Sequence, residues 1–134
     1  MPKRIFYVSV MAAHTTDLDI RAIVSASTIW NRRQDITGLL LATRTHFAQV
    51  LEGRAEAIAA VMERIRSDDR HRSIEILVDV DAAKRQFGRW AMAYLRRDDS
   101  SQTLEQMHMA RDPAQAQAFM SLLEALSIDL ASEP

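Results

Sequence analysis

Three polar side chains in apolar surroundings are the candidates for chemistry in this sequence: Tyr7, Asn31 and Gln49. Gln49 alternates with Phe47 and Leu51, so its amide is expected to point into an apolar layer. A buried amide without a hydrogen-bond partner costs about 1–3 kcal/mol. A tyrosine hydroxyl, a ligand with both donors and acceptors, or a loop would satisfy it, and the position alone leaves all three open.

Each of the other candidates has a plain structural explanation when it is taken alone. Tyr7 shares one side of its apolar segment with Ile5, as a core tyrosine with a bonded hydroxyl does. Asn31 falls at the expected end of a helix, where Asn is a common cap. Trp90 and Met92, two residues apart, are typical core residues of a strand.

Patterns for other kinds of chemistry are missing from the sequence. The chain has no cysteine, which excludes disulfides and thiolate ligands, and its four histidines show no metal-ligand spacing, so no metal is expected. No glycine-rich phosphate loop or nucleophile elbow is present. Arg32 and Arg33 leave open a small enzyme acting on an acidic substrate, although cations at a helix C-terminus also have a dipole explanation.

Length and composition predict one domain. The 134 residues are 48% hydrophobic, which is enough for a packed core. A net charge of -1 argues against a strongly basic nucleic-acid-binding module. The sequence has neither a signal-peptide pattern nor an apolar run of transmembrane length, so we expect a cytoplasmic protein without a membrane partner.

Period-two alternation and short apolar runs predict the strands that must position these side chains. The first four cover residues 4–10, 36–43, 46–52 and 74–80. On a fifth strand, Trp90, Met92 and Tyr94 are expected to share one side.

Two helices separate these strands. Thr16 and Asp19 resemble an N-cap pair, which predicts a helix over 17–31. A second helix follows Gly53, because apolar residues recur there at helical spacing: Ile58, Val61, Met62 and Ile65.

The order of these elements predicts an α+β fold, a ferredoxin-like βαββαββ sandwich with both helices on one sheet face. We expect the first and third strands to lie side by side and parallel, which would bring Tyr7 close to Gln49. This unit is expected to span residues 1–97.

Residues 98–134 are expected to form a helical extension. Leu104 and Met107 predict a short helix, and Asp112 before Pro113 predicts the start of a final one. The residues expected on one face of that helix are Phe119, Leu123, Leu126 and Leu130. The extension would cover the open sheet face or pair with another protomer.

The combination of motifs is more specific than any single residue. YVS at 7–9, Asn31 seven residues before Gly38 in ITGLLL, and FAQVLEG at 47–53 resemble the BLUF family of flavin photoreceptors. The resemblance covers roughly residues 4–97 and continues through RIRSDDRHR at 64–72, FGRW at 87–90, and Met92.

The resemblance implies that a flavin isoalloxazine ring lies between the two helices. Tyr7 would donate an electron and a proton, and Gln49 would bridge Tyr7 and the flavin N5 and C4 carbonyl. Asn31 would hydrogen-bond the flavin carbonyl region. Trp90 and Met92 match the pair thought to relay the signal through the fifth strand.

Three further residues are assigned to the cofactor on the same resemblance. Arg64 and Asp68 are similar to family positions near the flavin rim, with a solvated helix face as the alternative. Trp30 departs from the family pattern, which has a polar or imidazole side chain there. We interpret its indole as stacked at the flavin edge and offering a second electron donor, or else as a core or interface tryptophan.

The resemblance therefore implies non-enzymatic blue-light sensing with bound FAD, with FMN or riboflavin as possible occupants. The expected partner is a separate downstream effector protein, the expected assembly is a homo-oligomer, and no direct nucleic-acid contact is expected. The alternative is a non-photoactive regulatory module of the same fold that holds another small molecule, with Gln49 and Asn31 as polar anchors.

Overall fold

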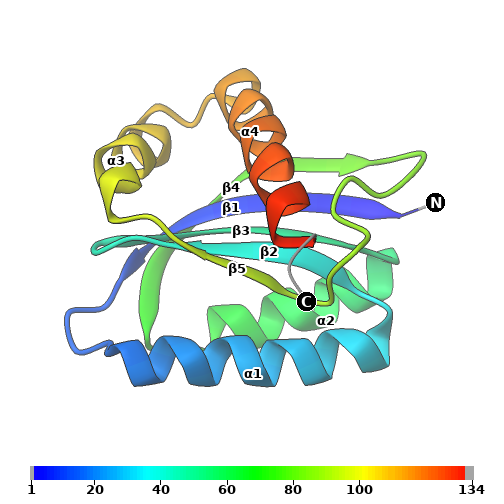
Figure 1. Cartoon of the computed structure of the whole chain (residues 1–134), viewed down its shortest axis with the longest axis horizontal. Coiled ribbons are helices and arrows are strands. Elements are labelled where there is room, and N and C mark those ends of the chain that lie inside the picture. Colours follow the sequence, from blue (N-terminus) through cyan, green and yellow to red (C-terminus); the bar gives the residue numbers. More distant parts are fainter. Residues whose placement is uncertain (1, 132–134) are drawn as a thin grey trace.

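A five-stranded sheet separates two layers of helices in the computed structural model (Figure 1). The structure describes residues 2–131 and the side chains of residues 2–127. The strands are β1 (Lys3–Met11), β2 (Thr37–Ala42), β3 (His46–Gly53), β4 (His71–Asp81) and β5 (Ala93–Arg96). The helices are α1 (Asp17–Gln34), α2 (Ala55–Arg66), α3 (Ser101–Ala110) and α4 (Pro113–Ala131), with a 3-10 turn, η1 (Asp98–Ser100), before α3. The α+β, ferredoxin-like βαββαββ fold predicted from the sequence is confirmed.

The strand order is β4-β1-β3-β2-β5, so β1 and β3 are neighbours as predicted. Their predicted direction is wrong, because β1 and β3 run antiparallel. The crossover through α1 makes β2 parallel to β1, and the hairpin at residues 43–45 then reverses β3. In the resulting register Tyr7 lies directly opposite Gln49.

Helix α1 begins where predicted and ends later. Thr16 and Asp19 form a reciprocal capping box, in which Asp19 N donates to Thr16 Oγ1 at 3.1 Å and Thr16 N donates to Asp19 Oδ2 at 2.9 Å. The C-cap is Asp35, in the left-handed conformation with φ 53°. Asn31 therefore lies inside the last turns, and its interpretation as the cap is wrong, because the chain stays helical through Arg32 and Arg33.

Both faces of β1 are buried, as its alternation predicts. Ile5 and Tyr7 face α1 and α2, while Phe6 and Val8 face the other layer. Helix α2 buries one apolar stripe against the first of these faces: Ala57, Ile58, Val61 and Met62.

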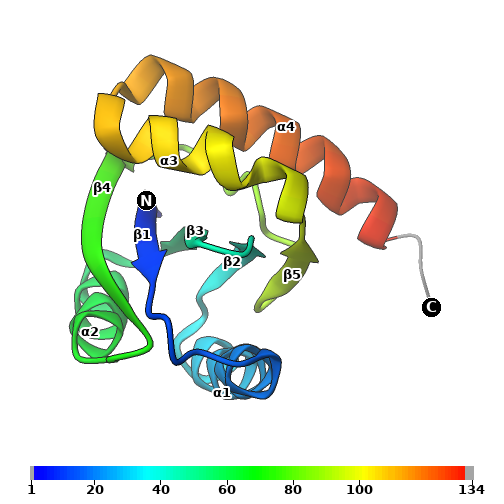
Figure 2. The same ribbon diagram turned by 90° about the vertical axis from the view of Figure 1, so that its left-hand side faces the viewer.

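Helices α3 and α4 cover the sheet face that α1 and α2 leave open (Figure 2). Leu104, Met107, Met120 and Leu123 belong to the same buried cluster as Phe6. The predicted packing of the tail is confirmed for Leu104, Met107, Phe119 and Leu123. Met120 was not among the predicted residues, and Leu130 lies outside the described side chains. Among residues 2–131, none of the helices combines the length and hydropathy needed to cross a bilayer.

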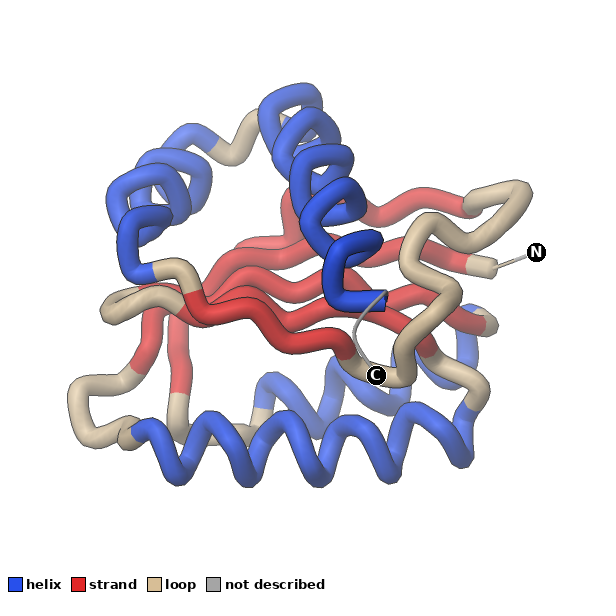
Figure 3. The backbone as a smooth tube through the Cα atoms, in the orientation of Figure 1, coloured by secondary structure: helices blue, strands red, loops and turns tan. Residues whose placement is uncertain are grey.

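The fifth strand is shorter than predicted, because β5 begins only at Ala93, beside and parallel to β2. A long loop over residues 82–92 precedes it (Figure 3). Trp90 and Met92 lie in this loop and on opposite sides of the sheet. Trp90 packs against the cluster under α3 and α4, and Met92 packs in the cluster under α1 and α2 with Tyr94. The prediction that these three share one side is therefore wrong.

Two acidic side chains, Glu52 and Glu124, hold the middle of the loop 82–92. The fully buried Glu52 carboxylate accepts hydrogen bonds from the backbone N–H groups of Gln86, at 2.8 Å, and Phe87, and from Arg4 Nε at 2.9 Å. Gln86 Nε2 also donates to Glu124 Oε1 on α4 at 2.8 Å. The buried charge is thus compensated by three donors, as buried carboxylates require.

Near its end the same loop lies beside β2. Gly38 N donates to the Trp90 carbonyl at 3.0 Å. Only glycine fits at position 38, because an added Cβ would lie 2.0 Å from the Val50 carbonyl oxygen.

Candidate functional site

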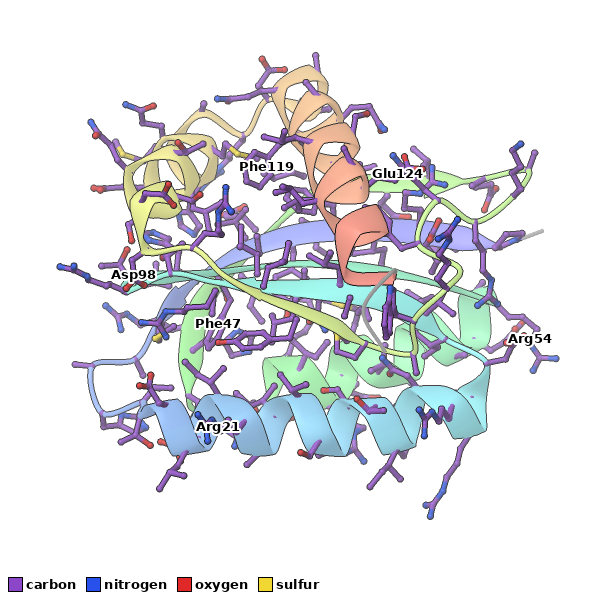
Figure 4. The ribbon with its side chains drawn as sticks, in the orientation of Figure 1. Arg21, Phe47, Arg54, Asp98, Phe119 and Glu124 are labelled. Atoms are coloured by element: carbon purple, nitrogen blue, oxygen red, sulfur yellow. The ribbon has the colours of Figure 1, made fainter. Side chains whose placement is uncertain are left out.

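A pocket opens between α1 and α2, beneath the sheet, and encloses about 110 Å³. Its lining side chains come from the strands β1, β2, β3 and β4, from the helices α1 and α2, and from the loop between α2 and β4. Ile23, Val61 and Ile65 supply apolar walls, and Leu40 and Phe47 face the pocket from the sheet. Figure 4 shows Phe47 between the strands and α1.

Tyr7 and Gln49 meet on the sheet side of this pocket because the β1–β3 register places them opposite each other. The Tyr7 hydroxyl donates a hydrogen bond to Gln49 Oε1, and both residues are buried. Burial raises the pKa of the Tyr7 phenol far above its usual value, and the negative charge of Asp68 raises it further. The phenol is therefore neutral at every physiological pH.

The other end of the Gln49 amide has a weak partner. Gln49 Nε2 donates to Met92 Sδ at 3.7 Å, and a thioether sulfur is a poor acceptor. A better acceptor in the pocket would therefore compete well for this N–H group.

Asn31 presents an unpaired acceptor to the same pocket. Its Nδ2 donates to the Ala91 carbonyl at 2.7 Å, which ties α1 to the loop 82–92. The side chain is fully buried, and its Oδ1 has no partner among the described residues. A buried acceptor of this kind costs about 1–3 kcal/mol unless a ligand satisfies it.

Trp30 and Arg64 stand together at the border of the pocket. The Arg64 guanidinium carbon lies 3.9 Å from the centroid of the Trp30 ring, within cation–π distance. Both side chains also line a shallower groove next to the pocket, so they separate its interior from its approach. The Trp30 Nε1 is buried and has no partner among the described residues.

Asp68 and Arg70 form an ion pair on the same border, with Arg70 Nη2 at 2.7 Å from Asp68 Oδ2. The hydrogen bond from the Arg70 side chain holds the pKa of the Asp68 carboxyl below its ordinary value. The pair is only part-buried, so its two charges are partly screened by solvent.

His71 and Ser9 form a connection that the sequence pattern does not predict. Ser9 Oγ lies 2.8 Å from His71 Nδ1, and His71 Nε2 lies 2.7 Å from the Ile65 carbonyl. His71, which also lines the pocket, thereby joins β1, β4 and the last turn of α2. In the sequence, the charged residues around His71 indicate a loop. The family resemblance of residues 64–72 was the only feature that could have drawn attention to this histidine.

The structure brings together most of the residues singled out in the sequence. The pocket is lined by all six expected cofactor contacts: Tyr7, Trp30, Asn31, Gln49, Arg64 and Asp68. Met92 joins them through Gln49, but Trp90 lies on the far side of the sheet. Arg32 and Arg33 are exposed and do not line the pocket.

The donor and acceptor set fits the edge of a flavin ring. Gln49 Nε2 can donate to a ring nitrogen or carbonyl, and Asn31 Oδ1 can accept from a ring N–H group. At about 110 Å³ the pocket is smaller than the usual range for ligand sites of ~300–1,000 Å³. A three-ring system would therefore require lining side chains to shift.

Comparison with known proteins identifies relatives of this chain. A family model described as BLUF, sensors of blue light using FAD, matches residues 3–93. The blue light- and temperature-regulated antirepressor BluF of Escherichia coli (strain K12) is 39% identical over 74 residues, which are 54% of this chain and 18% of that protein. The photoactivated adenylate cyclase subunit beta of Euglena gracilis is 38% identical over 68 residues, which are 51% of this chain and 8% of that protein. The chain thus spans less than a fifth of either relative.

Solved structures show the same fold at greater coverage. The dark-state structure of the BLUF protein BlrB has a TM-score of 0.80 and 25% identity, over 92% of this chain and 96% of that one. BlsA in its photo-activated state has a TM-score of 0.77 and 27% identity, over 92% and 95%. A family match over more than half of the chain, joined to this site, identifies the chain as a member of the BLUF family, sensors of blue light that use FAD.

Proposed function

We propose that the light response arises at Tyr7 and Gln49, against the edge of a flavin held in the pocket between α1 and α2. The observation that carries this proposal is the buried hydrogen bond from Tyr7 to Gln49 Oε1. The Gln49 N–H group meanwhile has only a sulfur partner. The Gln49 oxygen is thus engaged by Tyr7, while its N–H group is available to donate to a ligand.

A bound flavin would supply a ring that absorbs blue light and that can accept an electron from a side chain when it is excited. Tyr7 is an oxidisable side chain on the pocket floor, and it holds its proton because burial raises the pKa of the phenol. Once Tyr7 loses an electron, its proton becomes strongly acidic and moves to Gln49 Oε1, the acceptor that touches it. When the electron returns, the proton returns to Tyr7 Oη, and the Gln49 amide is left in a different arrangement.

Four other side chains would bind and orient the cofactor. Asn31 Oδ1 would accept a hydrogen bond from the ring, which would satisfy its unpaired acceptor. Arg64 and Asp68 lie where the pocket meets the groove, so they would face the rim and the side chain of the flavin. Trp30 would stack at the ring edge as a second electron donor.

Met92 and Trp90 would carry the change away from the pocket. A rotated Gln49 amide alters its contact with Met92 Sδ, and Met92 ends the loop 82–92. Trp90, two residues earlier, packs against the layer of α3 and α4. The loop therefore offers a route from one face of the sheet to the other.

The ring contacts suit FAD, and FMN or riboflavin would present the same ring. We assign residues 1–97 to the flavin-binding unit and residues 98–134 to the helical extension. The proposed setting is the cytoplasm, with signalling as a homo-oligomer to a separate effector protein and without direct nucleic-acid contact. Support comes from the relatives, in which this module is a small part of an antirepressor or of a cyclase subunit.

A light-minus-dark absorption spectrum of the purified protein tests the proposal. The protein should be yellow, and its flavin bands should shift to the red under blue light and recover in darkness. A protein that is colourless and takes up no added flavin would contradict the proposal. It would favour a module that holds another small molecule.

A further inference from the structure

The end of the molecule around residues 35–38 carries a concentrated positive charge. We propose that this surface docks a carboxylate-rich segment of a partner protein. It consists of Ile29, Arg32, Arg33, Arg54 and Arg89, and we name it the arginine face. The proposal does not depend on the flavin.

Contacts with one short segment, Asp35–Gly38, bring these residues together. Arg32 and Arg33 end α1 just before it. Arg54 follows Gly53, where an added Cβ would lie 3.4 Å from the Asp35 carbonyl oxygen. Arg89 precedes Trp90, whose carbonyl accepts from Gly38 N at 3.0 Å. Figure 4 shows Arg54 pointing outward at this end of the molecule.

The charges of the arginine face are unmatched. Among the described residues, none of its four arginines forms an ion pair, and all four are exposed. The nearby Asp35 is paired with Arg85 at 3.3 Å. At the opposite end, by contrast, Arg96 is paired with both Asp17 and Asp98. Among the described residues, Arg21, Arg66 and Arg72 are likewise exposed and without an ion pair, but they lie on other parts of the fold, so the arginine face is distinguished by the grouping of its four arginines at one end.

Local helix stability does not explain this cluster. The helix dipole accounts for Arg32 and Arg33, which lie in the last turn of α1. Arg54, however, is the N-cap of α2, where a cation is unfavourable and where it makes no side-chain capping bond. Arg89 lies in a loop. Two of the four arginines thus have no structural role in the described contacts.

The arginine face suits a protein partner better than a nucleic acid. Ile29 is 56% exposed and lies three and four residues before Arg32 and Arg33, so the three share one helix surface. An exposed apolar side chain beside arginines is typical of protein interfaces. Nucleic-acid affinity comes largely from the number of phosphate contacts, and four guanidinium groups on a chain of net charge -1 provide few of them.

The test uses a fluorescent peptide of glutamate and leucine, measured by anisotropy with the intact protein. The variant R32A/R33A/R54A/R89A should weaken binding by about tenfold, the sum expected of four exposed charge pairs. The control R21A/R44A/R66A/R72A removes the same charge from exposed arginines elsewhere, of which only Arg44 is ion-paired among the described residues, with Asp98 at 3.8 Å, and it should bind like the unchanged protein. The Ile29→Ala substitution should weaken binding of the peptide but should leave binding of a DNA duplex probe unchanged.

Three results would overturn the proposal. One is equal loss of peptide binding in the control variant, which would mean that only net charge matters. Another is a DNA duplex that binds more tightly than the peptide at about 150 mM salt and whose binding is abolished in the variant R32A/R33A/R54A/R89A. The third is the absence of peptide binding to the unchanged protein. Far-UV circular dichroism and the flavin spectrum would show that each variant is folded.

Discussion

Tyr7 and Gln49 show how a residue gains a role from its neighbour across the sheet. Both side chains are buried, and one hydrogen bond satisfies the Tyr7 hydroxyl as donor and the Gln49 carbonyl oxygen as acceptor. Removing the hydroxyl leaves Gln49 Oε1 unpaired, at a cost of about 1–3 kcal/mol. Loss of the hydroxyl also removes the group that is proposed to donate both the electron and the proton from residue 7.

Tyr7→Phe should therefore retain flavin and lose the light-induced red shift. The ring still fills its place in the core, so the free energy of unfolding should fall only by the amount given above. Light-minus-dark spectra and urea unfolding measure the two effects. Tyr94→Phe, in the same buried cluster but outside the pocket, is the matched control and should shift normally. A normal photocycle in Tyr7→Phe would exclude the proposed mechanism while leaving the cofactor assignment.

Asp68 makes stability depend on pH in the acid range. Its folded pKa is lowered, chiefly by the hydrogen bond from Arg70, so its stabilisation is complete above its unfolded pKa of about 3.9. That stabilisation is lost as pH falls through the lower, folded pKa. Asp68→Asn should cost about 0.5–1 kcal/mol at neutral pH, because the pair is half-exposed.

The difference between Asp68→Asn and the unchanged protein should vanish at the lowest pH. Urea unfolding at a series of pH values measures it. Glu63→Gln, an exposed carboxylate on the same groove, serves as the control. A constant difference between the two proteins across the pH range would show that the ion pair does not stabilise the fold.

Single residues in the sequence did not identify the site, and their combination did. Tyr7, Asn31 and Gln49 come from three elements, so only topology joins them. Asn31 was expected as a helix cap, because sequence patterns locate helix ends poorly when cations continue the last turn. His71 was missed because its hydrogen bonds run to Ser9 and Ile65, which are distant in the sequence.

Among the elements, β2 and β3 leave no room for a side chain at Gly38. An added Cβ there would lie 2.0 Å from the Val50 carbonyl oxygen, which is backbone and cannot turn aside. Gly38→Ala should lower the free energy of unfolding by at least about 2 kcal/mol through overpacking.

Gly88→Ala is the matched control for this change. Its Cβ would meet only the Arg85 side chain, at 3.3 Å in an exposed loop, so the expected change is within about 0.5 kcal/mol. Urea unfolding of the two variants decides the point. Equal stability of both would mean that the strands can separate at Gly38 without cost.

The alternation of side chains predicted that the strands exist, but it did not predict their boundaries or their relative directions. Residues 90–92 alternate like a strand, yet Trp90 and Met92 lie on opposite sides, because the backbone there bonds to Asn31 and to Gly38 rather than to a full ladder. Strand direction depends on the crossover through α1, which short-range patterns do not contain.

For the whole molecule, the second layer of helices decides whether the sheet is stable in water. The apolar residues under α3 and α4 include Phe6, Val8, Leu39, Leu41 and Val50. A chain ending at residue 97 would expose them together, and exposed patches of this kind cause association.

The fragment 1–97 should therefore elute as oligomers or aggregate, and size-exclusion chromatography measures this. Leu123→Asp in the full chain places a charge under α4 and should produce the same tendency. Leu122→Asp, on the exposed side of the same helix, should not. A fragment that stays monomeric and binds flavin would show that residues 98–134 are dispensable for the fold.

The buried Glu52 carboxylate limits how far a disturbance at Met92 can travel. Gln86 and Phe87 are tied to it through their backbone N–H groups, so the stretch left to adjust is Gly88–Met92, whose Trp90 and Ala91 carbonyls accept from Gly38 and Asn31. Trp90 lies within that length. The fluorescence of its indole should consequently respond to illumination before any change in α4. Trp90 would then be an intrinsic fluorescent reporter of the earliest movement of the loop 82–92.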